Sequence, residues 1–277
     1  MYGFDEIIDQ QRPVRILDTF LRKNTIPHAL LFTGLEGVGK TTAALTFAMA
    51  GNCVGAQPEP SRQTVTDTRN PDDAAAGITP CGVCRSCRKI MAGNHPDVLR
   101  LKPSGAFIRI GQVRELCDTL TLKPYEAKLR VVIISDAHTM NPSAANALLK
   151  MLEEPPERTI LILTAPQASD LLPTIASRCQ LIRFNPIRRE SIAARLQAEG
   201  LGAEEARVLS ILANGSLSRA LDMLRSNWIQ RRNWLVAAGG PGSIDAPASR
   251  SRRQMLAVAE VLANDKKSVD DALTTLS

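Results

Sequence analysis

The chain has 277 residues, of which 44% are hydrophobic, and this length allows one large α/β domain plus a smaller second domain. The formal net charge of +6 is spread among acidic residues, and only 4% of the residues are aromatic, so charge alone does not indicate a nucleic-acid-binding surface. The first residues lack the basic-then-apolar pattern of a secretory signal, and no apolar run approaches membrane-spanning length, so we expect a cytoplasmic protein without a membrane partner.

The first predicted elements surround a glycine-rich loop. We expect a helix over residues 12–24, a short buried strand over residues 29–32, and a second helix over residues 40–49. Between this strand and the second helix, the sequence Gly-Leu-Glu-Gly-Val-Gly-Lys-Thr matches a phosphate-binding loop at every fixed position. The alternative is a glycine-rich turn that matches by accident, but the strand, loop and helix context favours nucleotide binding. The predicted nucleotide-binding residues here are Gly34, Gly37, Val38, Gly39, Lys40, Thr41 and Thr42.

Four cysteines flank a polar segment that we expect to be a flexible surface insertion, residues 54–80. Disulfides are not expected in a reducing compartment, so the cysteine spacing indicates metal binding or core packing. Cys81, Cys84 and Cys87 form two overlapping C-x-x-C steps, and Cys53 can supply a fourth ligand once the insertion loops back. Four thiolates predict a closed, structural zinc site, with buried or redox-active cysteines as the alternative.

Three other residues of metal-binding or catalytic type have simpler interpretations. His95 is a substitute candidate for the metal site, although its Asn-His-Pro-Asp context favours a turn residue. Cys117 lies on an apolar helical face and is expected in the core. His138 is expected to pack at the end of a strand rather than to act as a base.

Further along the chain, apolar strands alternate with helices. Strands are expected over residues 129–135, 160–163 and 181–184, with a helix over residues 141–154 after the first of them. This alternation predicts a parallel, doubly wound α/β sheet. The first of these strands is followed by Asp136, which in such a sheet lies beside the phosphate-loop crevice.

From residue 186 the pattern becomes purely helical. Helices over residues 188–199, 203–213 and 216–224 predict a small all-α domain. One more helix can follow over residues 226–238, and residues 239–249 have the composition of a linker.

Four segments are more specific than a generic phosphate loop. They are Pro-His-Ala-Leu-Leu-Phe-Thr-Gly at 27–34, Leu-Lys-Pro-Tyr at 122–125, Asn-Ala-Leu-Leu-Lys-Met-Leu-Glu-Glu-Pro-Pro at 146–156, and Ser-Arg-Cys at 177–179. Over about residues 1–225 the chain resembles the AAA+ clamp-loader subunits of bacterial DNA polymerase III. The resemblance implies a AAA+ phosphate-loop domain over 1–185 with an inserted zinc module at about 53–90, a helical lid over 186–226, and a C-terminal helical collar over 227–277 that is truncated or reduced.

Within that family, two departures distinguish the ATP-hydrolysing gamma/tau motor from the delta-prime type. The motor type ends its second strand in Asp-Glu, which orients the water shell of magnesium and prepares the attacking water, whereas this chain has Ser135 and Asp136. The motor's Gly-Ser-x-Arg appears here with one extra residue before Arg219, and one residue turns a helix by about 100°. Both departures indicate the delta-prime type, with ATP and magnesium binding allowed and weak or absent hydrolysis.

The resemblance also implies the remaining site residues and the partners. Arg178 of the Ser-Arg-Cys segment would reach ATP held by a neighbouring gamma subunit as an arginine finger, the alternative being a local cap or ion pair. Thr164 resembles a nucleotide-sensing position, and an ordinary strand-end hydroxyl is the alternative. The implied partners are the gamma/tau and delta subunits, the sliding clamp, and primed DNA through the complex. The competing functions are a gamma/tau-type motor and a stand-alone ATP- and zinc-dependent DNA-binding module.

Overall fold

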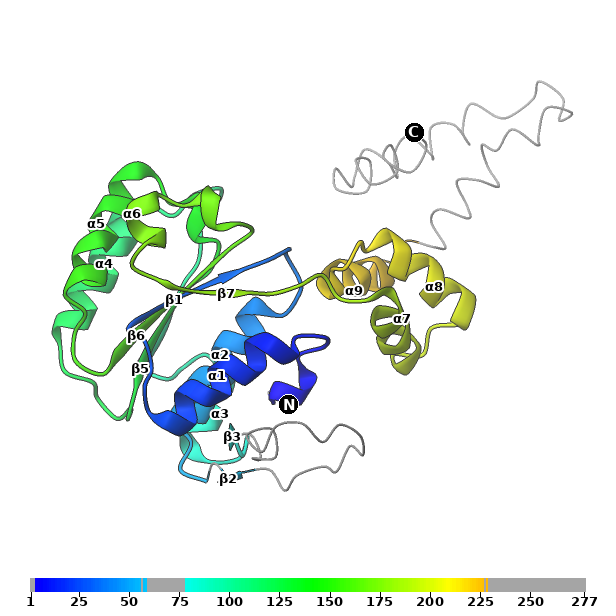
Figure 1. The fold of residues 1–277 in the computed structure, drawn as a ribbon, viewed down its shortest axis with the longest axis horizontal. Coiled ribbons are helices and arrows are strands. Elements are labelled where there is room, and N and C mark those ends of the chain that lie inside the picture. The colour runs from blue at the N-terminus through cyan, green and yellow to red at the C-terminus, as the bar shows by residue number, and fades with distance from the viewer. Residues whose placement is uncertain (1–2, 56, 59–77, 227, 229–277) are drawn as a thin grey trace, which may run out of the picture.

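Short apolar segments that alternate with helices build a central sheet in the part of the chain that the structure describes, residues 3–55, 57–58, 78–226 and 228 of a computed structural model (Figure 1). Most of the expected insertion and of the expected C-terminal collar lies outside the described residues. The strands are β1 Ala29–Thr33, β2 Gln57–Pro58, β3 Ile78–Thr79, β4 Val98–Leu101, β5 Arg130–Ile134, β6 Thr159–Ala165 and β7 Gln180–Arg183. The α-helices are α1 Gln11–Lys23, α2 Lys40–Asn52, α3 Arg85–Met91, α4 Ile110–Thr121, α5 Pro142–Glu153, α6 Pro173–Ala176, α7 Arg189–Ala198, α8 Ala203–Leu212 and α9 Leu217–Arg225. Short 3-10 helices are η1 Phe4–Glu6, η3 Ala137–Thr139 and η4 Ala168–Asp170.

The main sheet has five parallel strands in the order β4-β5-β6-β1-β7. β1 pairs with β6 on one side and with β7 on the other, while β2 and β3 form a separate antiparallel pair. Because the strands are parallel, their carboxyl ends share one edge. The loop after β1 therefore lies at the same edge as the residues that follow β5 and β6.

The two faces of the sheet are both buried. Leu30 and Phe32 of β1 pack in the core cluster that contains α1 and α2, whereas Ala29 and Leu31 pack in the cluster that contains α4, α5 and α6. Figure 1 shows these two groups of helices on opposite faces. A strand that is covered on both faces needs apolar residues at every position, which is why the strands read as continuous apolar runs.

Helix α5 is bounded by residues that the sequence analysis used to predict it. The Asn141 side chain accepts a hydrogen bond from the backbone N–H of Ala144 (2.8 Å), and Pro142 occupies the first helical turn. The helix ends at Glu153, shortly before Pro155, which cannot continue a helix. These boundaries place Glu153 at the end of α5 next to the amino-terminal edge of the sheet.

Helices α7, α8 and α9 follow β7 and pack on one another. Ile192, Leu196 and Leu209 lie in their shared apolar interior, and the Ser216 side chain caps α9 by accepting from the Arg219 N–H (3.2 Å). The described part of the chain after β7 is therefore helical, as expected. Its assignment as a separate domain stays a prediction.

The start of the chain is tied to the segment between β7 and α7. The side-chain amide of Gln10 both donates to the Asn185 carbonyl (2.7 Å) and accepts from the Asn185 N–H (3.0 Å). Asp9 accepts from the backbone and the guanidinium of Arg188, and these hydrogen bonds lower the pKa of the Asp9 carboxyl against the opposing effect of burial. These contacts fix where the helical segment leaves the sheet.

Several expectations differ from the structure. The sequence pattern did not predict β4, whose Val98–Leu101 run includes an exposed Arg100, because an edge strand has one sheet neighbour and needs fewer apolar residues. Nor did the pattern predict α3, the short helix that follows Cys84.

Two side chains are also placed differently from what was expected. The expectation that His138 packs at a strand end is wrong, since it lies exposed in η3, beyond the end of β5. Cys117 is half-buried rather than fully in the core, because it lies at the margin of the α4 contact.

A buried carboxylate organises the loop before β5. The Asp97 side chain, 2% exposed, accepts from the backbone N–H groups of Tyr125 (2.9 Å), Glu126 (2.8 Å) and Ala127 (2.9 Å), and faces the guanidinium of Arg130 (3.4 Å). Burial raises the pKa of Asp97, but the three N–H groups and Arg130 outweigh it, so the net shift is downward. This carboxylate therefore ties the end of the Leu-Lys-Pro-Tyr segment and the two residues after it to the residue that precedes β4.

We expect Asp97→Ala to lower the free energy of unfolding by about 3–5 kcal/mol, because it leaves the buried Arg130 without its partner. Because folding lowers the pKa of Asp97, its contribution is present above the unfolded value of about 3.9 and is lost as the pH falls through the folded value. Urea unfolding at several pH values checks both points. The exposed Asp118→Ala is the control, and an equal effect of both variants at neutral pH would contradict the prediction.

His95 belongs to the same region rather than to a metal site. It is buried, and its Nδ1 accepts from the Asp97 N–H (3.2 Å), as a turn residue does. Burial lowers the pKa of His95, and the nearby Glu126 opposes this shift. The candidate metal group found among the described residues consists of four cysteines without His95.

Candidate nucleotide and metal sites

The phosphate loop has the backbone that its glycines predict. Gly34, Gly37 and Gly39 have φ values of 143°, 79° and 101°, a region that side chains rarely adopt. A Cβ on Gly34 would lie 2.5 Å from the carbonyl oxygen of Phe184. Helix α2 begins at Lys40 immediately after the loop, so its N-terminal N–H groups and their partial positive charge face the loop.

Lys40 is turned into its own loop. It is buried, and its Nζ donates to the carbonyl oxygens of Gly34 and Leu35, the latter at 2.8 Å. Burial lowers the pKa of Lys40, and the carboxylates of Asp136 and Glu36 partly offset this shift. A phosphate could replace the two carbonyl oxygens as the acceptor for the ammonium group. Thr41 and Thr42 follow in the first turn of α2 and are partly exposed.

The N-terminus of α9 contacts the loop directly. The Gly37 carbonyl accepts from the backbone N–H groups of Leu217 (3.1 Å) and Ser218 (3.4 Å). A Cβ on Gly37 would lie 2.3 Å from the Ser216 Oγ, so glycine is needed for this close approach. Sequence reasoning missed this contact, although the serine before a helical pattern marks a helix N-terminus. Arg219, the residue directly after Ser218, is exposed on α9.

Ser135, Asp136 and Thr164 meet at the carboxyl edge of the sheet. Ser135 is buried at the end of β5, and the exposed Asp136 has a left-handed backbone (φ 52°). Thr164 is 2% exposed, and its hydroxyl accepts from the Asp136 N–H (3.0 Å), linking the ends of β5 and β6. Thr164 therefore positions Asp136, as an ordinary strand-end hydroxyl does. A direct contact of Thr164 with nucleotide stays a prediction.

Arg178 lies at the opposite edge of the sheet from the phosphate loop. It precedes β7, whose Gln180 pairs with Leu30 and whose Arg183 pairs with Thr33, the last residue before the loop. Strands advance about 3.3 Å per residue, so the paired strands alone separate the two edges by about 10 Å. The Arg178 side chain is 37% exposed and donates to Glu153 (2.8 Å) and to the Thr174 carbonyl (2.9 Å).

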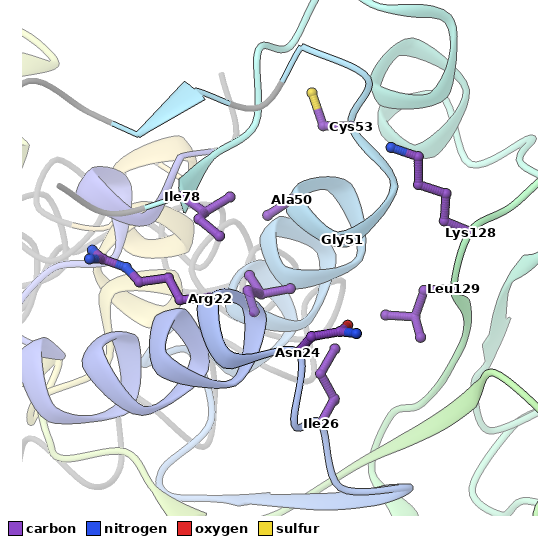
Figure 2. A pocket seen from close by; sticks show the side chains of 10 residues that line it. Arg22, Asn24, Ile26, Ala50, Gly51, Cys53, Ile78, Lys128 and Leu129 are labelled. Carbon is purple, nitrogen blue, oxygen red and sulfur yellow. The ribbon is translucent and has the colours of Figure 1, made fainter. Parts of the chain in front are cut away.

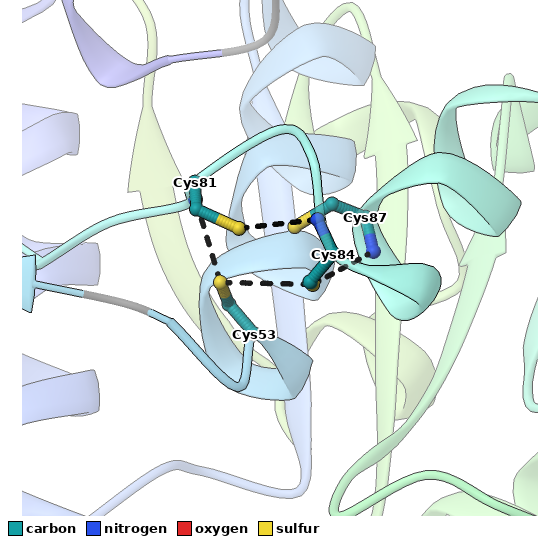
Figure 3. Close-up of side chains that lie close together, drawn as sticks. All are labelled: Cys53, Cys81, Cys84 and Cys87. Atoms are coloured by element: carbon teal, nitrogen blue, oxygen red, sulfur yellow. Dashed lines mark hydrogen bonds between the residues drawn. The ribbon is translucent and has the colours of Figure 1, made fainter.

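The four predicted metal ligands converge on one point (Figure 3). Their sulfur atoms all lie within 4.8 Å of one another, and the Sγ atoms of Cys53 and Cys84 are 4.0 Å apart. Four thiolates at Zn–S distances of about 2.3 Å around a tetrahedral ion have sulfur separations of about 3.8 Å. The donor set and its spacing therefore fit a metal ion of the zinc type.

Backbone N–H groups also surround these sulfurs. The N–H of Cys81 donates to Cys53 Sγ (3.4 Å), that of Cys84 to Cys81 Sγ (3.3 Å), and that of Cys87 to Cys84 Sγ (3.4 Å). Burial raises the pKa of the Cys84 thiol, but backbone hydrogen bonds from Cys87 and Val54 outweigh it and the pKa falls to about 6. Burial raises the pKa of Cys53 and Cys87, the two cysteines that are most enclosed.

Comparison with known proteins identifies the family. A family profile described as "DNA polymerase III, delta subunit" matches residues 9–188. DNA polymerase III subunit delta' of Bacillus subtilis is 33% identical over 218 residues, which are 79% of this chain and 60% of that protein. The chain belongs to the DNA polymerase III clamp-loader family. It is similar also to the gamma/tau branch, since subunit tau of Escherichia coli is 31% identical over 226 residues, 79% of this chain and 32% of that protein.

The clamp-loader chain thus spans only part of the length of these relatives, about three fifths of the first. Among solved structures, the RuvB Holliday junction branch migration motor of Thermotoga maritima matches with a TM-score of 0.51 and 15% identity, covering 95% of this chain and 72% of that one. This likeness shows a shared fold and carries nothing about function. Among the described residues no helix is long and apolar enough to cross a membrane.

Two cavities lie outside the phosphate loop of this clamp-loader fold. The larger, of about 570 Å³, lies between α1, the end of α2, β3 and the start of β5, and Cys53 and Lys128 are at its margin (Figure 2). The smaller, of about 270 Å³, is lined by residues of η3, α5 and α6, including His138 and Asp170. Neither is lined by a residue of the phosphate loop, so neither is the predicted nucleotide site.

Proposed function

We propose that this chain acts as the delta-prime-type subunit of a DNA polymerase III clamp loader. In this role it assembles with gamma/tau and delta subunits and helps to load the sliding clamp on primed DNA. It supplies Arg178 in trans to ATP that is bound by a neighbouring gamma/tau subunit. The similarity to subunit delta' of Bacillus subtilis supports this assignment over the motor type.

The single observation that carries the trans role is the position of Arg178. Its guanidinium is partly exposed at the amino-terminal edge of the sheet, while the chain's own phosphate loop lies at the carboxyl edge. An arginine there is far from ATP bound to its own loop, but it is available to a subunit that packs against that edge. Its planar fork of donors suits a phosphate group whose negative charge increases in the transition state.

The residues after β5 support the proposal that this chain itself hydrolyses ATP only weakly. A motor subunit needs a carboxylate that orients the water shell of magnesium and a second one that prepares the attacking water. Here Ser135 is a buried hydroxyl, and Asp136 is the sole carboxylate of the pair. Lys40 and Thr41 retain the groups that hold the phosphates and magnesium of ATP, so we infer that the chain binds ATP but turns it over slowly.

The remaining parts of the chain have supporting roles in this proposal. Helices α7 to α9 act as a lid, which is supported by the contact of the α9 N-terminus with Gly37. The proposed zinc ion is held by Cys53, Cys81, Cys84 and Cys87. Because the four thiolates fill all of its coordination positions, the ion stabilises the module and has no open position for catalysis. Residues 227–277 are assigned to a partial collar by family resemblance alone.

Reconstitution with gamma and delta subunits tests the proposal. We expect the chain to co-elute with both subunits, while the pure chain binds ATP through Lys40 and turns it over slowly or not at all. Lys40→Ala should weaken ATP binding by the lone chain, measured by calorimetry. DNA-stimulated turnover by the lone chain, abolished by Lys40→Ala, would instead establish a motor. A salt-sensitive DNA complex without association with gamma or delta would establish a stand-alone DNA-binding module.

A further inference from the structure

Arg178 is held by two contacts from different helices. One terminal nitrogen donates to Glu153 Oε1 (2.8 Å), at the end of α5, and the other donates to the Thr174 carbonyl (2.9 Å), in α6. The side chains of Arg178 and Glu153 are 37% and 51% exposed. The guanidinium is therefore fixed in orientation while it remains accessible from solvent.

Two fixed contacts matter because arginine is a long side chain with much rotational freedom. Ordering such a side chain costs about 2 kcal/mol of conformational entropy, so a finger that is already oriented loses less when it meets a phosphate. A guanidinium carries five N–H donors, and the two contacts among the described residues use two of them. Exposed ion pairs are also weak, typically up to about 1 kcal/mol, so Glu153 does not prevent a phosphate from binding.

We propose that Glu153 is a positioning residue for Arg178. It holds the guanidinium against the Thr174 carbonyl and directs the remaining donors outward, toward a triphosphate bound by an adjacent subunit. This inference rests on the trans role proposed above. Glu153 does not touch the nucleotide, and it acts through the orientation of Arg178.

The test is a double-mutant cycle in the complex reconstituted with gamma and delta subunits. We expect Glu153→Ala to lower ATP turnover at the site facing Arg178 by about three- to tenfold, with assembly unchanged. Glu153→Gln keeps an oxygen that can accept from Arg178, so it should retain more turnover than Glu153→Ala. In an Arg178→Ala background, Glu153→Ala should have no further effect, because the group that it positions is gone.

A matched control separates this role from general stability. Arg195 of α7 and Glu199, the residue that follows α7, form an ion pair of the same length, 2.8 Å, with side chains 50% and 43% exposed, so Glu199→Ala should leave turnover unchanged. Equal losses from Glu153→Ala with and without Arg178 would show a structural role and overturn the inference. Full turnover with Glu153→Ala, when Arg178→Ala is impaired, would overturn it while leaving the trans role intact. Full turnover in both single variants would remove the trans role and this inference with it.

Discussion

Replacing Arg178 by alanine should lower ATP hydrolysis at the neighbouring site by about three orders of magnitude or more, the range measured for arginine fingers. The reason is that, in the proposed trans role, the guanidinium neutralises charge that develops on the transferred phosphoryl group. Arg178→Lys should recover only part of the rate, because an ammonium group lacks the planar fork of donors. Single-turnover hydrolysis by the reconstituted complex measures this effect.

The control for this experiment is Arg195→Ala, which removes an exposed arginine of α7 that also has a carboxylate partner at 2.8 Å. That variant should hydrolyse ATP at the normal rate. Arg178→Ala should still assemble, because its exposed ion pair with Glu153 contributes little to stability. Normal single-turnover hydrolysis by an assembled Arg178→Ala complex would contradict the trans role.

Replacing Cys84 by serine should release one zinc ion per chain and lower thermal stability. A ligand that binds only the folded protein, at a free concentration about 1,000-fold above its dissociation constant, stabilises it by about 4 kcal/mol. Cys84 is central to the cluster, since its sulfur accepts from Cys87 N–H and lies 4.0 Å from the Cys53 sulfur. Metal analysis and thermal melting of both proteins, with and without a chelator, measure the two effects.

The matched control is Cys117→Ser, since Cys117 is a half-buried cysteine of α4 outside the metal group. The Cys117→Ser protein should keep its zinc. Its melting temperature should therefore not show the fall that loss of metal causes in Cys84→Ser. Loss of zinc should act on stability first, because a closed four-thiolate site has no open position for a substrate. A wild-type protein that contains no metal and is as stable as Cys84→Ser would refute the assignment.

Local sequence determined the elements that carry the fold. The strand, loop and helix around Lys40 follow from glycines at fixed positions between two apolar runs, and α5 follows from Asn141 and Pro142 at its start and Pro155 after its end. The two C-x-x-C steps predicted the cysteine cluster, because that spacing brings sulfurs together in a tight turn. In these cases most of the interacting residues are close in the chain, so the pattern contains the interaction; Cys53, which lies 28 residues before Cys81, is the exception.

Only the tertiary structure decided which distant groups meet. The pairing of Arg178 with Glu153, the contact of the α9 N-terminus with Gly37, and the three N–H groups on Asp97 join segments that no periodicity connects. The strand order decided most, because placing β7 beside β1 puts Arg178 and the phosphate loop at opposite edges of one sheet. A sequence pattern specifies which face of a strand is apolar. Which other strands lie beside that strand depends on the packing of the whole core.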